Sequence, residues 1–164
     1  MTDSDAAGQA LVTLRRRVDA HFTAAVERNP DAFACRAGCA SCCRAGLSVF
    51  GIEADRIRAA LAQLPSPTRL RVAEQAAVET PTHCPLLVDG LCSIYTQRPI
   101  LCRSHGLAVR APGAQGQVDW CELNYTETTP PAASVLALDA VNQPLAVMAQ
   151  MWGGERTALA DLAR

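Results

Sequence analysis

Lysine is missing from this chain of 164 residues, and its fifteen basic residues are all arginine. Without a lysine amine, the chain has no residue for a Schiff base or for a lysine general base. Its formal net charge is −1 and the sequence has no stripe of basic residues. The chain therefore has no positively charged surface to attract nucleic acid or an anionic membrane. We therefore expect no nucleic acid and no membrane among its partners.

Long apolar runs and large aromatic rings are scarce as well. Nowhere do eighteen apolar residues follow one another without a charge or a helix breaker, so the sequence contains no candidate transmembrane helix. Hydrophobic residues make up 49% of the chain, but much of that share is alanine, and only seven residues are Phe, Tyr or Trp. This composition predicts one small domain, residues 1–164, with a core of modest side chains.

The N-terminal segment "MTDSDAAGQALVTLRRRV" is acidic, then apolar, then basic. A secretory signal has the opposite order, with its basic residues before the apolar run, so we expect a cytoplasmic protein. A reducing compartment keeps cysteines as thiols. The eight cysteines of the chain therefore point to a bound metal rather than to disulfides.

Hydrophobic periodicity predicts a mainly α fold. The first helix is expected to end at Asn29-Pro30, where the hydrophobic periodicity stops, and Pro144 is expected to kink or break the last helix. The predicted helices cover residues 6–28, about 53–64, about 68–78 and about 134–152. Between them, the segment from about 35 to 121 is rich in Gly, Pro and Cys, and its "VDGLCSIY" predicts a tight Asp-Gly turn between two short strands. We expect a small helical domain that carries an irregular, cysteine-rich metal-binding lobe.

The cysteines fall into two groups with different spacing. The stretch "CRAGCASCCRAG" has the pattern C-x3-C-x2-C-C, and the later cysteines are separated by 7, 9 and 18 residues. Spacings of two and three residues let successive thiolates turn toward one zinc ion or one iron–sulfur cluster. The candidate ligands are Cys35, Cys39, Cys42, Cys43, Cys84, Cys92, Cys102 and Cys121. The side chains of adjacent residues are expected to diverge. The adjacency of Cys42 and Cys43 therefore predicts either two neighbouring metal centres or one multinuclear cluster.

Several polar residues near the second group are candidates for supporting roles. Arg98 and Arg103 are expected to offset thiolate charge and to donate hydrogen bonds to sulfur, and Tyr95 to donate one more. His83 and His105 are each either a ligand, a hydrogen-bond donor near the ligands, or an ordinary surface histidine. The sequence leaves these alternatives open.

The two cysteine segments together resemble a known family. "CRAGCASCC", followed by "CPLLVDGLCSIYTQRPILCR", is similar to the bacterial YkgJ-type cysteine-cluster proteins, described as zinc- or iron-chelating domains. The resemblance covers about residues 35–103. Its first motif departs from the family's usual C-x2-C, because three residues separate Cys35 from Cys39. The resemblance implies metal binding and leaves the metal open.

Three functions fit these observations. An iron–sulfur protein with a redox or sensing role is narrowly favoured, because short cysteine spacings and a Cys-Pro pair are typical of cluster ligands. A structural zinc domain that mediates protein interaction is the first alternative. A thiol redox or metal-buffering protein that uses Cys42 and Cys43 as a reactive pair is the second. No nucleotide-binding loop and no Ser-His-Asp spacing is present, so a conventional dehydrogenase or hydrolase is not indicated, and catalysis, substrate and electron-transfer partner stay open.

Overall fold

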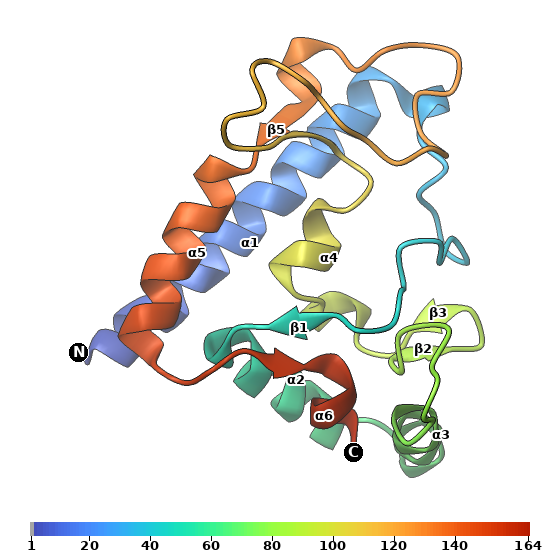
Figure 1. Cartoon of the computed structure of the whole chain (residues 1–164), viewed down its shortest axis with the longest axis vertical. Helices are drawn as coiled ribbons and strands as arrows, with labels where there is room; N and C mark the ends of the chain where they lie inside the picture. Colours follow the sequence, from blue (N-terminus) through green and yellow to red (C-terminus); the bar gives the residue numbers. More distant parts are fainter. Residues whose placement is uncertain (1) are drawn as a thin grey trace. The chain divides into compact units, whose positions relative to one another are not determined.

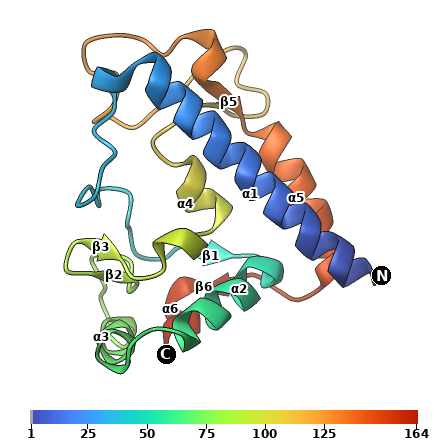
Figure 2. The ribbon, with the colours of Figure 1, turned by 180° about the vertical axis from the view of Figure 1, so that it is seen from behind.

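The computed structural model of the protein describes residues 2–164 (Figures 1 and 2). The chain is 50% helical, with six α-helices and little sheet within these residues, which confirms the predicted mainly α fold. Contacts within the chain define two compact units. Unit 1 comprises Met1–Arg36 and Ile100–Met151, and unit 2 comprises Ala37–Pro99 and Trp152–Arg164. The expectation of one domain over residues 1–164 stays a prediction.

Unit 1 is built on the long helix α1, Asp3–Arg28. The helix starts three residues before the position predicted from the hydrophobic pattern, because Thr2 and Asp5 form a capping box. The Thr2 hydroxyl accepts a hydrogen bond from the Asp5 backbone N–H at 3.1 Å, and the Asp5 carboxylate accepts one from the Thr2 N–H at 3.0 Å. The apolar stripe of α1 is buried along its length, at Ala7, Leu11, Leu14, Val18 and Ala25.

The rest of unit 1 packs along α1. The short helix α4, Ile100–Ser104, contacts α1, and α5, Asp139–Trp152, runs beside it in both ribbon views (Figures 1 and 2). The ion pair between Arg103 on α4 and Asp19 on α1, at 2.5 Å, links two of these helices. Arg103 is only 5% exposed, so this ion pair satisfies a guanidinium that is otherwise removed from water.

The last predicted helix begins later than expected. Instead of starting near residue 134, the chain forms a 3₁₀-helix, η3, at Ala132–Ser134, and then strand β5, Val135–Ala137. Strand β5 pairs in parallel with β4, Ala108–Arg110, so backbone pairing with a distant segment overrides the local helical pattern. Pro144 lies inside α5 without ending it.

Unit 2 has its own core under three helices and a small sheet. Helix α2 is Gly51–Ala62, α3 is Ser66–Ala76 and α6 is Leu159–Ala163. Strands β1, Ser48–Val49, and β6, Thr157–Ala158, pair antiparallel. The core of this unit consists of Val49, Ala54, Ile57, Leu61, Val72, Ala76, Cys84, Leu86, Ile94, Leu159 and Ala163. A cysteine of the second group is therefore one of the core residues.

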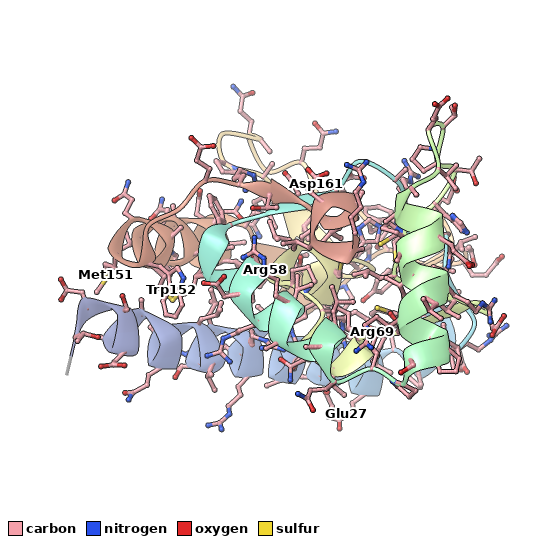
Figure 3. The ribbon with its side chains drawn as sticks, turned by 90° about the horizontal axis from the view of Figure 1, so that it is seen from below. Glu27, Arg58, Arg69, Met151, Trp152 and Asp161 are labelled. Atoms are coloured by element: carbon pink, nitrogen blue, oxygen red, sulfur yellow. The ribbon has the colours of Figure 1, made fainter. Side chains whose placement is uncertain are left out.

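The second segment of unit 2 is attached to α2 by polar contacts. The indole N–H of Trp152 donates a hydrogen bond to Asp55 at 2.9 Å, and Asp55 also pairs with Arg58 at 2.7 Å. Trp152 and Arg58 are labelled in Figure 3. These bonds hold the chain at the start of the segment that continues into β6 and α6, which complete the core of the unit.

The predicted Asp-Gly hairpin is confirmed. Strands β2, Leu87–Val88, and β3, Leu91–Cys92, pair antiparallel across Asp89 and Gly90, whose φ angles are 52° and 77°. Two positive φ angles are the requirement of a tight hairpin turn, and glycine meets it without steric cost. The turn also receives a two-pronged ion pair from Arg71 on α3, at 2.5 and 2.7 Å. The hairpin thereby fixes the place of Cys92 in unit 2.

Across the described range of the chain, residues 2–164, none of the helices has both the length and the apolar character needed to cross a membrane.

Replacing Gly90 by alanine tests the hairpin. A side chain at φ 77° is forced into the left-handed region, so we expect Gly90→Ala to lower the free energy of unfolding by about 1–2 kcal/mol. Urea denaturation of the reduced, metal-free protein measures this change. An unaltered midpoint would mean that the turn does not require glycine.

Candidate metal site

The structure divides the eight cysteines between the two units. Unit 1 contains Cys35, Cys102 and Cys121, and unit 2 contains Cys39, Cys42, Cys43, Cys84 and Cys92. None of the eight takes part in a disulfide. The nine-residue motif that starts the cysteine pattern thus contributes to both units, because the unit boundary falls between Arg36 and Ala37.

Four of the sulfurs in unit 2 come from three pieces of backbone that hydrogen-bond to one another. Residues 40–44 form tight turns, in which the N–H of Cys43 donates to Ala40 at 2.9 Å. The N–H of Cys84 donates to the carbonyl oxygen of Cys43, also at 2.9 Å. Cys92 lies opposite Leu87 in the hairpin, and the Leu87 N–H donates to the carbonyl of Cys84 at 3.1 Å. We call Cys42, Cys43, Cys84 and Cys92 the four-cysteine cluster.

The pKa values of this cluster reflect how close its thiols are. The pKa of Cys42 is raised far above its usual range, first by a hydrogen bond with the side chain of Cys43, then by burial and by the charge of Cys43. Burial is the main cause that raises the pKa of Cys84 and of Cys92, and the charge of Cys42 raises both further. The side chains of Cys42 and Cys43 are therefore within hydrogen-bonding range of each other, and two neighbouring centres or one multinuclear cluster stays a prediction.

The chemistry of this donor set fits a thiophilic metal. Four sulfurs from separate segments are the typical ligands of a structural zinc ion or of an iron–sulfur cluster. Raised pKa values keep Cys42, Cys84 and Cys92 as neutral thiols near pH 7, so a metal must displace their protons in order to bind. Among residues 2–164, no three His, Cys, Asp or Glu side chains are arranged around one metal position. The thiols are gathered, but they do not form a closed coordination sphere.

Arg98 and Tyr95 lie together beside Cys92. The Arg98 guanidinium stacks over the Tyr95 ring at 4.0 Å and donates a hydrogen bond to the Tyr95 carbonyl oxygen at 3.1 Å. The positive charge of Arg98 also lowers the pKa of Cys92, although burial, which raises it, has the larger effect. The Tyr95 side chain itself is 61% exposed. Arg98 thus places a positive charge near the sulfur of Cys92, and its role toward a metal stays a prediction.

The other supporting candidates are Arg103 and His105 in unit 1 and His83 in unit 2. Arg103 is held by Asp19 in unit 1. His105 is exposed and follows the last residue of α4, so it does not share a helical face with Cys102. His83 lines a cavity of about 170 Å³ in unit 2. Cys84 forms part of the wall of the same cavity, together with polar residues that include Arg44, Gln75, Glu79 and Arg164.

Asn124 in unit 1 was not indicated by any sequence motif. Its side chain is 1% exposed and donates hydrogen bonds to the sulfur of Cys35 at 3.3 Å and to the carbonyl oxygen of Gly106 at 2.7 Å. Its backbone N–H donates to the carbonyl of Cys121 at 2.9 Å. One asparagine therefore links three segments that are far apart in sequence, and two of them carry candidate ligands.

Comparison with family models gives one match, over residues 34–125. The matching model, CxxCxxCC, is described as "Putative zinc- or iron-chelating domain". The match covers more than half of the chain and includes all eight cysteines. Comparison with curated proteins and with solved structures gives no significant match.

Thiol reactivity tests the burial of the four-cysteine cluster. Cys84 is 7% exposed and has a raised pKa, whereas Cys39 in the same unit is half-buried. We expect iodoacetamide to alkylate Cys84 roughly tenfold more slowly than Cys39 in the reduced, metal-free protein, because only an accessible thiolate reacts. Peptide mass spectrometry over time measures both rates, and urea should bring them together. Equal rates without urea would contradict the buried position of Cys84.

Proposed function

The chain belongs to the CxxCxxCC family of zinc- or iron-chelating domains, and we propose that it holds its metal through the four-cysteine cluster of unit 2. The observation that carries this proposal is the convergence of the four thiols. Cys42 is close enough to Cys43, Cys84 and Cys92 for its charge or hydrogen bonding to be felt at each of them. The remaining candidate ligands are Cys35, Cys39, Cys102 and Cys121.

A bound metal would remove an electrostatic conflict. Four thiolates in a partly buried cluster repel one another, and burial disfavours each charge further. A zinc or iron centre neutralises this charge, and its binding free energy is then added to the stability of unit 2. Arg98, whose charge lowers the pKa of Cys92, would offset the excess negative charge that remains on the sulfurs.

An iron–sulfur cluster with a redox or sensing role is the favoured form of this function. The contact between the side chains of Cys42 and Cys43 suits a centre with several metal atoms, where neighbouring sulfurs bind different metals. A single zinc ion with four sulfur ligands is the alternative, and it would make unit 2 a structural module that presents a surface to a protein partner.

A thiol redox function of Cys42 and Cys43 is less well supported. The reactive form of cysteine is the thiolate, and reactive cysteines have a lowered pKa. The pKa of Cys42 is raised instead, so this thiol is a weak nucleophile in the absence of metal.

Metal analysis distinguishes iron from zinc. Protein purified without oxygen should contain iron and acid-labile sulfide, and should absorb visible light. A colourless protein that contains zinc alone would overturn the iron–sulfur assignment and leave metal binding intact. A protein with neither metal would overturn the proposed function.

Serine variants test the ligands. Cys42→Ser and Cys84→Ser should each abolish metal binding in unit 2, because a serine hydroxyl is a poor ligand for zinc or iron compared with a thiolate. Metal content per protein after anaerobic reconstitution is the measurement. Ser41→Ala is the matched control, since Ser41 is adjacent to Cys42, is exposed and has no sulfur. If the serine variants kept their full metal content, the four-cysteine cluster would not be the binding site.

A further inference from the structure

We propose that Asn124 is the positioning residue of Cys35, and that Gly106 provides the space in which Asn124 and the Cys35 sulfur meet. This inference goes beyond the proposed function, because it treats Cys35 of unit 1 as a metal ligand in addition to the four-cysteine cluster of unit 2. Asn124 would not touch the metal. It would hold the sulfur in place and donate an N–H group to it, as residues around metal ligands commonly do.

The orientation of the Asn124 amide is determined by its neighbours. The Ala34 N–H can only donate, and it lies 2.9 Å from Oδ1. The Gly106 carbonyl oxygen can only accept, and it lies 2.7 Å from Nδ2. Oxygen and nitrogen therefore cannot be exchanged, and the Nδ2 group faces the Cys35 sulfur at 3.3 Å. The donor is directed at the sulfur by two other hydrogen bonds of the same side chain.

Burial makes this arrangement rigid. Asn124 is 1% exposed, so any hydrogen bond that it lost would leave a buried polar atom without a partner. Cys35 is exposed as a residue, so a metal ion can approach it from solvent. The sulfur thus has a fixed, hydrogen-bonding support within a residue that is itself exposed. An N–H group that donates to a thiolate stabilises its charge and tunes the metal–sulfur bond.

Gly106 is needed because the sulfur occupies the place of a side chain. A Cβ atom built on Gly106 would lie 2.6 Å from the Cys35 sulfur and 3.5 Å from Nδ2 of Asn124. The φ angle of Gly106 is +95°, a conformation that other residues rarely adopt. Any larger residue would displace the sulfur from its donor. Gly106 also follows α4, so the segment with Cys102 ends at this point.

The test compares variants that alter the contact with sulfur against matched controls. Asn124→Asp keeps an oxygen acceptor for Ala34 but loses the N–H donor to the Cys35 sulfur and to the Gly106 carbonyl oxygen, and Asn142→Asp makes the same change at an exposed position on α5. Gly106→Ala places a methyl group on the sulfur. Gly113→Ala makes the same change at φ +71°, where nothing lies within 4 Å. Co²⁺ titration of the reduced protein gives affinity, and sulfur-to-cobalt charge-transfer absorption reports the thiolate ligands.

We expect Cys35→Ser and Asn124→Asp to weaken the binding of Co²⁺ at the site that includes Cys35 by a similar factor, about 10–100-fold. The double variant should bind no more weakly than Cys35→Ser alone, because Asn124 acts through that sulfur. Gly106→Ala should weaken binding in the same way, while Asn142→Asp and Gly113→Ala should match the wild type. The far-UV circular dichroism of each variant, unchanged from that of the wild type, shows that the chain is folded.

Several results would overturn the inference while leaving the proposed function intact. An unchanged cobalt affinity in Asn124→Asp would show that the amide does not support binding. An unchanged affinity in Cys35→Ser would show that Cys35 is not a ligand. Losses that add in the double variant would show that Asn124 has a structural role only. If Asn124→Asp failed to fold, equal affinities of Gly106→Ala and Gly113→Ala would overturn the inference by themselves. A wild-type protein that takes up no Co²⁺ would overturn both the inference and the proposed function.

Discussion

The mutual repulsion of closely spaced thiolates is the constraint on which unit 2 depends. Cys42 contacts the side chain of its neighbour Cys43. Burial is the main cause that raises the pKa of Cys84 and Cys92, and the charge of Cys42 raises both further. As thiols these groups are compatible with a partly apolar environment, whereas as thiolates they require a positive centre. The protonation state and the metal content of the cluster are therefore linked, and the fold around it tolerates only combinations that keep the total charge small.

The cluster is also part of the hydrophobic core. Cys84 packs in the same core as Val49, Leu86 and Ile94, and Cys43 and Cys92 pack against it. A chain with only seven aromatic residues has few large side chains with which to fill a core. Sulfur has a second use here as a small apolar group. Binding chemistry and packing thus share the same residues, so a substitution in the cluster affects both.

Local patterns were sufficient to predict the four longer helices and the Asp89-Gly90 hairpin, because each depends on residues close in sequence, but they missed the short helices α4 and α6. They could not predict that β5 pairs with β4, since that pairing joins segments 27 residues apart and replaces the start of a helix. They also could not identify Asn124, whose partners Ala34 and Cys35 are 90 and 89 residues away. The cysteines themselves were recognisable as candidates, but their division between two units depends on the tertiary fold.

The interleaving of the two units along the chain has a consequence for synthesis on the ribosome. Helix α1 emerges first, yet its partner helices α4 and α5 follow only after residues 37–99 have been made. The apolar stripe of α1 therefore stays exposed to solvent while the five cysteines of unit 2 are synthesised. Unit 2 in turn lacks β6 and α6 until the final residues of this sequence are added. Neither unit can finish folding ahead of the other by much, and the thiols are accessible to metal or to oxidants during that interval.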